Sequence, residues 1–305
     1  MKISSKITLL GLSFCTLILG CNQTQQPTTN VAEKGNVVLA SYSPTNDFNA
    51  YWYAGKGELN RYDLTIERYG EMRKGSAVCV FVTEDVSAAK QVKLDDPAAV
   101  PKDRVPVLKL NQLQRFVTGV YDYSLMQSVF TPVDFKKYPH SLKCNTTVQD
   151  WCGHVFTQLN LKDKTFKVNQ FSYFEQEGDQ TFDVEAALLE TELFTRLRID
   201  PLSIPQGKVK MIADLTFSRL RHKGVAAVDA EISVKDGVCH VNYPSLKRLL
   251  DITFDVKSPH IIKSWKETMS DGKLISEAIL KKTIMSDYWG HHSEADLTLQ
   301  KELGL

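Results

Sequence analysis

This chain of 305 residues is long enough for one large domain or two modest ones, and its 43% hydrophobic and 24% charged residues are ordinary for a folded globular protein. Thirty-seven basic and 36 acidic residues leave a formal net charge of +1, so no overall field gathers nucleic acid or an anionic membrane surface. We therefore expect no nucleic-acid partner.

The N-terminus has the pattern of an exported protein. Lys2 and Lys6 precede a short apolar run that ends at Gly20, which is the charged start and apolar middle of a secretory signal peptide over residues 1–20. The run is too short to span a bilayer, which takes about 20 apolar residues. Its last four residues, Ile18-Leu19-Gly20-Cys21, resemble the lipobox of bacterial lipoproteins, which implies lipid attachment at Cys21. An ordinary signal peptide with an incidental cysteine is the alternative.

The segment after Cys21 bears on location. Residues 21–36 are polar and offer almost nothing to bury, so we expect a disordered tether. Asn22 follows Cys21, whereas the inner-membrane retention signal of many bacteria resembles an aspartate at this position. Residues 22–30 also contain no acidic cluster of the kind that suggests export to the cell surface. We therefore expect a lipid-anchored protein on the periplasmic face of the outer membrane. Residues 37–305 form a single β-rich domain in this reading, and a sub-division near 200–207 is the alternative.

Short apolar or alternating runs separated by turn residues predict strands through most of this domain. The alternation over residues 228–234 and the Asp236-Gly237 pair, which suits a type I′ hairpin turn, are the clearest signals. The predicted strands are Val37–Tyr42, Leu59–Tyr69, Ala77–Thr83, Val107–Phe116, Val117–Phe130, Val155–Leu161, Phe166–Phe174, Val228–Val234, Val238–Tyr243, Ile252–Val256, Ile261–Met269 and Leu274–Thr283.

One segment predicts a long helix. Asp183 offers an N-cap, Pro201 offers a stop, and apolar residues at spacings of three and four form one stripe between them: Ala186, Leu189, Leu193 and Leu197. We expect Val184–Arg198 to be the longest helix. The fold prediction is therefore mainly β (α+β), a large antiparallel meander sheet, curved or partly closed, with one long helix.

Motifs of familiar catalytic and metal sites are absent from the sequence. It contains no Gly-x-Ser-x-Gly elbow, no His-Glu-x-x-His pair and no phosphate-binding P-loop, so we expect no cofactor and no metal. His291 and His292 would point apart on a strand or helix, and His154 beside Cys152 lacks further ligands for zinc. We interpret these histidines as surface or hydrogen-bonded residues.

The cysteines and aromatic residues each leave an alternative open. Free buried thiols are expected, although a Cys144–Cys152 bridge would form if their strands or turns face one another. Aromatic residues either fill the core of a large sheet or line an apolar ligand cavity. The candidate lining residues are Trp52, Trp151, His154 and Trp289.

Three segments carry a family resemblance: Tyr51-Trp52-Tyr53-Ala54-Gly55, Trp151-Cys152-Gly153-His154 and Ser172-Tyr173-Phe174-Glu175. They resemble landmarks of a family of bacterial envelope lipoproteins of unknown function, some of whose members carry the label septum formation inhibitor Maf. The resemblance runs from about Tyr51 to the C-terminus. It implies an anchored envelope protein.

True Maf proteins are cytoplasmic nucleotide pyrophosphatases with an N-terminal Leu-Ala-Ser-x-Ser-Pro-Arg-Arg motif. Leu39-Ala40-Ser41-Tyr42-Ser43-Pro44 is similar to its start, but Thr45 and Asn46 replace the two arginines, which would bind phosphate bidentately. We therefore expect no hydrolysis of nucleoside triphosphates. The predicted function is a non-catalytic binding or scaffold module for an apolar ligand or an envelope partner. A Maf-like nucleotide pyrophosphatase or another hydrolase is the alternative.

Overall fold

A fifteen-stranded sheet organises residues 45–305, the part of the chain that the computed structural model describes. The expectations for the signal peptide, Cys21, the tether, the strand Val37–Tyr42 and the Maf-like segment 39–44 concern residues outside this range. Every neighbouring pair of strands is antiparallel except β9 and β10. The prediction of a mainly β fold with an antiparallel sheet is confirmed.

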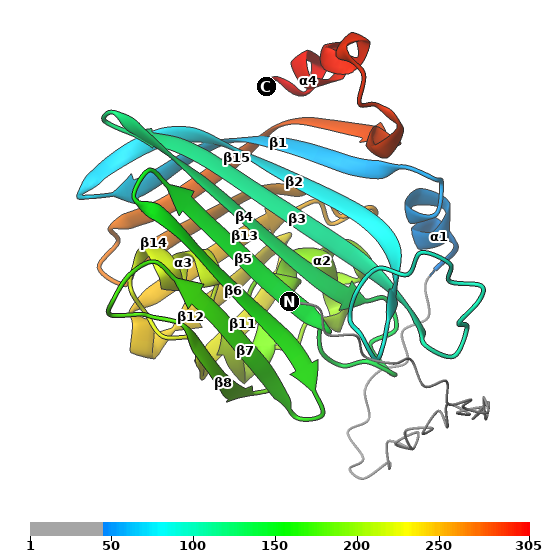
Figure 1. Ribbon diagram of the computed structural model, residues 1–305, viewed down its shortest axis with the longest axis horizontal. Coiled ribbons are helices and arrows are strands. Elements are labelled where there is room, and N and C mark those ends of the chain that lie inside the picture. Colours follow the sequence, from blue (N-terminus) through cyan, green and yellow to red (C-terminus); the bar gives the residue numbers. More distant parts are fainter. Residues whose placement is uncertain (1–44) are drawn as a thin grey trace, which may run out of the picture. The chain divides into compact units, whose positions relative to one another are not determined.

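The first half of the sheet is a meander in chain order (Figure 1). Its strands are β1 (Gly57–Arg68), β2 (Glu71–Ser87), β3 (Arg104–Thr118), β4 (Tyr121–Pro132), β5 (Lys143–Asp150), β6 (Gly153–Lys162), β7 (Thr165–Ser172) and β8 (Gln180–Glu185).

The second half begins at the opposite edge and returns to the first half, because β15 pairs with β1. Its strands are β9 (Leu188–Leu189), β10 (Gly207–Ile212), β11 (Ala227–Lys235), β12 (Val238–Tyr243), β13 (Arg248–Phe254), β14 (Ile262–Met269) and β15 (Leu274–Ser286). Among the described residues β8 pairs only with β7 and β9 only with β10, so the sheet is not closed.

Two short helices fill the space between the halves of the sheet: α2 (Glu192–Ile199) and α3 (Leu215–Leu220). Figure 1 shows both behind β3–β6, with β11–β13 on their far side. On that far side, the ring centroid of Phe194 in α2 lies 5.5 Å from that of Trp265 in β14. All eight residues of α2 are buried. The interior is therefore packed with side chains from both halves and from the helices.

The other helical elements are short and lie outside the sheet's interior or at its connections. They are α1 (Asn46–Trp52), α4 (Leu297–Leu303) and the 3-10 turns η1 (Pro201–Ser203), η2 (Pro244–Leu246), η3 (Tyr288–Gly290) and η4 (Glu294–Asp296). At residues 200–207, η1 leads directly into β10 of the same sheet. Within residues 45–305, no helix combines the length and apolar character needed to cross a bilayer.

The predicted long helix over Val184–Arg198 is wrong. Val184 belongs to β8 and pairs with Phe166, while Leu188 and Leu189 pair with β10, so helix α2 begins only at Glu192. Of the apolar residues spaced at three and four, Ala186 is half-buried in a loop, Leu189 is buried in β9, and Leu193 and Leu197 are buried in α2. Short apolar runs do not distinguish a strand from a helix, and here tertiary burial determines the outcome.

The strand predictions within the described range are confirmed, with shifted ends. Asp236 and Gly237 both adopt positive φ, at 50° and 78°, as a type I′ turn requires. Cys144 is buried in β5, whereas Cys152 is exposed in the β5–β6 turn, and both are free thiols. Burial also raises the pKa of the Cys79 and Cys239 thiols to about 12.

Gly75 in β2 marks a close approach of two strands. A Cβ at this position would lie 2.1 Å from the carbonyl oxygen of Arg115 in β3, so a side chain forces the strands apart. We expect Gly75→Ala to lower the free energy of unfolding by about 1–3 kcal/mol, as overpacking does. Urea denaturation checks this, with Gly224→Ala as control because no atom lies within 4 Å of its Cβ position. Equal stability of the two variants would contradict it.

Candidate functional site

Four connections between strands lie together at one end of the first half of the sheet. They are the turns at 69–70, 119–120 and 151–152 and the loop at 173–179, and we call this end the hairpin end (left in Figure 1). A pocket of about 170 Å³ opens there between the 173–179 loop and α3. Its polar walls come from Thr157, Gln170, Gln180 and Ser218, and its apolar walls from Phe182, Leu215 and Val225.

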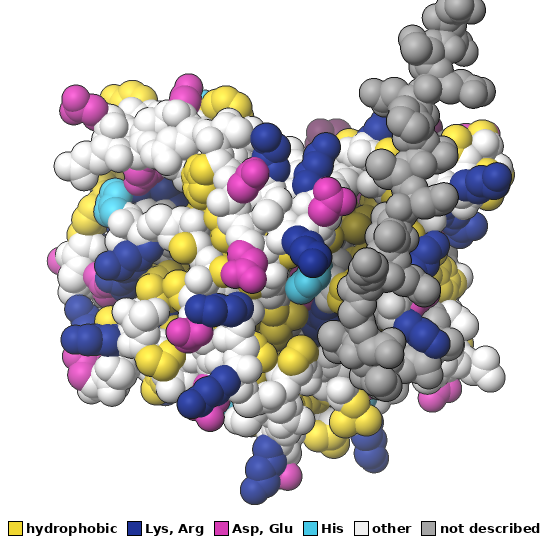
Figure 2. All heavy atoms as spheres, turned by 90° about the horizontal axis from the view of Figure 1, so that it is seen from below, with side chains coloured by type: hydrophobic (Ala, Val, Ile, Leu, Met, Phe, Trp, Pro, Cys, Tyr) yellow, Lys and Arg dark blue, Asp and Glu magenta, His cyan; other side chains and the backbone are white. Residues whose placement is uncertain are grey.

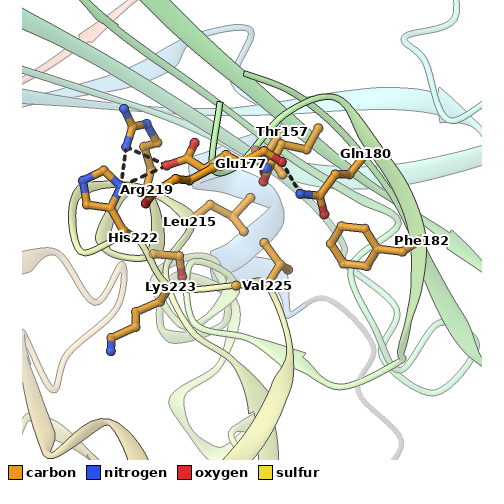
Figure 3. Close-up of a pocket in the computed structure, with 13 residues that line it drawn as sticks. Thr157, Glu177, Gln180, Phe182, Leu215, Arg219, His222, Lys223 and Val225 are labelled. Atoms are coloured by element: carbon orange, nitrogen blue, oxygen red, sulfur yellow. Dashed lines mark hydrogen bonds and ion pairs between the residues drawn. The ribbon is translucent and has the colours of Figure 1, made fainter. Parts of the chain in front are cut away.

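A trio of polar side chains, Glu177, Arg219 and His222, forms one side of the pocket, opposite Gln180 and Phe182 (Figure 3). Arg219 Nη1 lies 3.0 Å from Glu177 Oε1, and His222 Nδ1 lies 3.1 Å from the same oxygen. The Arg219 guanidinium also stacks over the Phe174 ring at 4.1 Å. Its Nε is buried and has no hydrogen-bond partner within residues 45–305. The trio is therefore held in place by packing as well as by charge.

The 173–179 loop positions Glu177 through its own hydrogen bonds. Ser172 Oγ donates to Glu177 Oε2 at 2.8 Å and accepts from the Phe174 amide at 3.1 Å. Gly178 closes the turn with φ of 61°, and its N–H donates a hydrogen bond to the Phe174 carbonyl oxygen. Both carboxylate oxygens of Glu177 are thus engaged by donors.

Helix α3 forms because Asp214 caps it and because a buried polar network holds that cap. Asp214 Oδ1 accepts from the Phe217 amide at 2.9 Å, which satisfies a free helix N–H. Gln127 Nε2 donates to Asp214 Oδ2 and to Thr191 Oγ1, both at 2.6 Å. The network joins α3 to β4 and to the residue that precedes α2.

The C-terminal end of α3 bridges the hairpin end. While Arg219 pairs with Glu177, the carbonyl oxygen of Leu220 accepts from Arg68 Nη1 at 2.9 Å, and Arg221 Nη2 lies 2.5 Å from Glu67 Oε2. Three consecutive residues at the end of α3, 219–221, therefore contact the 173–179 loop and the end of β1. These bonds fix the α3 side of the pocket to the 173–179 loop and to the end of β1.

Beside this bridge, three tyrosine hydroxyls meet Arg68. The hydroxyl oxygens of Tyr69 and Tyr123 are 2.7 Å apart, Tyr121 donates to Tyr69 at 3.1 Å, and Arg68 donates to Tyr123 at 3.2 Å. Desolvation opposes ionisation of Tyr69, but the hydrogen bonds from Tyr121 and Tyr123 and the charge of Arg68 hold its pKa below the ordinary value.

Two of the three landmark segments meet at the hairpin end. Val155 pairs with Ser172 in the β6–β7 ladder. A Cβ on Gly153 would lie 2.6 Å from Cγ of Tyr173, so this ring is seated directly on the glycine. Tyr51–Gly55 instead belongs to α1 and the turn that precedes β1, at the opposite end of that strand.

The structure does not gather the four candidate lining residues into one cavity. Trp52 is buried in α1, with its ring centroid 6.2 Å from that of Phe81. Trp151 and His154 are exposed at the β5–β6 hairpin, and Trp289 is exposed in η3. None of them lines the pocket of Figure 3. Trp151 and His154 lie at the same end of the strands as the pocket.

The two histidines near the C-terminus, His291 and His292, are both exposed. His291 is bridged between Asp296 and Asp287, each 3.0 Å away. Within residues 45–305 no three His, Cys, Asp or Glu side chains are grouped to hold a metal ion.

The hydrogen bonds and charges of Asp296 and Asp287 raise the pKa of His291. We expect Asp296→Asn to lower that pKa, because the largest of these interactions is removed. NMR titration of the imidazole resonances measures the change, with Asp271→Asn as a control that leaves both partners in place. An unchanged His291 pKa in the Asp296→Asn variant would contradict the prediction.

A second hollow, of about 470 Å³, lies over β10 and β11. Its polar side chains include Lys210 and Asp229, an exposed ion pair with a separation of 2.9 Å, which is typical of a solvated surface. Figure 2 likewise shows basic, acidic and hydrophobic side chains interspersed over the face drawn, without a region of one sign. The pocket at the hairpin end is therefore the stronger candidate.

Sequence reasoning missed the residues of this pocket. Glu177 and Arg219 are 42 residues apart, and nothing in the sequence relates them. A local signal for α3 was present, because Asp214 offers an N-cap and basic residues follow at 219–223.

No family model, curated protein or solved structure matches this chain.

Proposed function

We propose that this chain is a binding module of the bacterial envelope that holds a polar ligand in the pocket at the hairpin end. The observation that carries the proposal is the fixed trio of Glu177, Arg219 and His222, opposite the uncharged amide of Gln180. Prearranged donors and acceptors around a small hollow favour binding without reorganisation.

The charged groups favour binding over catalysis. A catalytic carboxylate must be within reach of a substrate proton or reacting atom. Glu177 instead accepts from Ser172 and Arg219, and its role is to hold the arginine beside the pocket. The proposal places a polar ligand at the hairpin end rather than an apolar ligand inside the sheet, where α2 and the core residues already fill the space.

The anchor belongs to the same proposal. Acylation of Cys21 would retain the protein on the periplasmic face of the outer membrane, because several acyl chains together give stable membrane binding. The tether of residues 21–36 would leave the sheet free to bind its ligand in the periplasm.

Purification of the full chain from its membrane, followed by mass spectrometry of co-purifying molecules, tests the pocket. Gln180→Trp would fill the hollow from exposed strand β8, whereas Thr181→Trp is the matched control, since alternate strand residues point to opposite faces. We expect one molecular species with wild type and Thr181→Trp, and its loss with Gln180→Trp.

The same preparations are incubated with nucleoside triphosphates and a divalent metal. Co-purification unaffected by Gln180→Trp would contradict binding in the pocket. Release of pyrophosphate would instead support the hydrolase that the sequence left as the alternative.

A further inference from the structure

The hairpin end carries an aromatic side chain in or directly beside each of its four connections. Tyr69 lies in the β1–β2 turn, Tyr121 begins β4, Trp151 lies in the β5–β6 turn and Tyr173 begins the 173–179 loop. Tyr69, Trp151 and Tyr173 are 59%, 69% and 67% exposed. We call these four residues the aromatic row. Large aromatic side chains this exposed at consecutive connections are a surface that favours contact with a ligand.

Neighbouring members of the row support one another. The Tyr121 and Trp151 ring centroids are 6.3 Å apart, and Tyr121 is hydrogen-bonded to Tyr69. Trp151 Nε1 donates to Asp122 at 2.8 Å, which fixes the indole. Tyr173 rests on Gly153, where no other residue leaves room for the ring. The row is thus a pre-ordered surface whose contact area does not have to be assembled on binding.

The row leads to the pocket. Tyr173 and Phe174 are adjacent, with ring centroids 5.4 Å apart, and the Phe174 ring lies beneath Arg219. Hairpins in a sheet recur at about 10 Å, twice the strand spacing. A ligand along the row would therefore be an extended chain whose end reaches the pocket.

The chemistry of the row fits a carbohydrate chain. A sugar ring has an apolar C–H face, which packs on an aromatic ring, and hydroxyls at its edge, which need donors and acceptors such as those of the pocket. A lipid surface fits poorly, because the exposed carboxylates of Glu71, Asp122 and Glu175 lie at the same turns. Anionic headgroups would repel them.

We propose that the aromatic row is a platform for an oligosaccharide chain whose terminal residue occupies the pocket. This inference rests on the proposed function, and it names the ligand class and the surface that extends the pocket.

Calorimetric titration of the full chain tests the platform by chain length. The probes are the dimers and hexamers of β-1,4-linked glucose, β-1,4-linked N-acetylglucosamine and α-1,4-linked galacturonic acid. We expect at least one hexamer to bind tenfold or more tightly than its dimer. Trp151→Ala should remove that gain and leave dimer affinity within about twofold, whereas Trp151→Phe should retain most of it.

Trp289→Ala is the matched control, since Trp289 is 53% exposed and lies outside the row. Equal affinity for dimer and hexamer, or loss of the gain in the Trp289→Ala variant, would overturn the platform. Failure of every hexamer to bind would also overturn it. The co-purification experiment tests binding in the pocket separately. A negative result for the platform therefore leaves the proposed function unaffected.

Binding to vesicles of phosphatidylethanolamine and phosphatidylglycerol tests whether the row contacts a lipid surface. All chains carry Cys21→Ser, so that no acyl group contributes to binding. We expect Trp151→Ala and Trp289→Ala to leave vesicle binding equal. Vesicle binding that Trp151→Ala alone abolishes would assign the row to a lipid surface and overturn the carbohydrate inference.

Discussion

Replacing Arg248 by methionine is expected to lower the free energy of unfolding by about 3–5 kcal/mol, the usual cost of leaving a buried charge without its partner. Arg248 is fully buried in β13 and bonds two carboxylates: Nη1 is 2.5 Å from Glu190 Oε2, and Nε is 2.9 Å from Glu267 Oε2. Its guanidinium also stacks over Phe217 of α3 at 4.3 Å. The variant leaves both carboxylates unpaired beneath the helix that forms the pocket.

Urea denaturation at neutral pH measures this loss. Lys210→Met is the control, because its ion pair with Asp229 is exposed and such pairs contribute about 0–1 kcal/mol. If Arg248→Met costs no more than Lys210→Met, the buried network has no role in stability.

We expect Arg198→Met to lower the free energy of unfolding by a similar amount, because it breaks a buried ion pair near the start of β1. Arg198 of α2 and Glu58 of β1 are both fully buried, and Arg198 Nη2 lies 2.5 Å from Glu58 Oε2. Tyr51 also donates to this carboxylate. The double variant Glu58→Leu/Arg198→Met should be more stable than either single variant, because no unpaired charge remains. A double variant less stable than both single variants would contradict this account.

The same pair predicts a dependence on pH. Burial alone would raise the pKa of Glu58, but the charge and hydrogen bonds of Arg198, with those of Tyr51 and Asn60, lower it overall. The ionised Glu58 therefore stabilises the folded protein fully above the ordinary carboxyl pKa of about 4.3. This stabilisation is lost as the pH falls through the lowered pKa of Glu58 in the folded state. The stability difference between wild type and Glu58→Gln should shrink in that range.

The strands could be predicted because their signals are local. Alternation over 228–234 and the turn at Asp236 and Gly237 require no knowledge of distant residues. The helix prediction failed for the opposite reason, since Leu188 and Leu189 are buried by pairing with β10, which follows later in the chain. The same local spacing served a strand, a loop and a helix.

The interior and the pocket depend on contacts over long separations. Glu58 and Arg198 are 140 residues apart, and no local pattern in the sequence relates them. The aromatic composition left open whether the aromatic residues fill the core or line an apolar cavity; Trp52 is buried in the core, whereas Trp151 is exposed at the hairpin end. Its proximity to Tyr121 and Tyr173 follows only from the order of the strands in the sheet.

Hydrogen exchange with and without the hexasaccharide that binds most tightly tests most directly that the hairpin end is the binding surface. The account predicts slower amide exchange at residues 151–154, 173–180 and 219–225, with no change in the connections 88–103 and 133–142 at the other end of the strands. Protection confined to those distant connections, with unchanged exchange around Trp151 and Glu177, would contradict it.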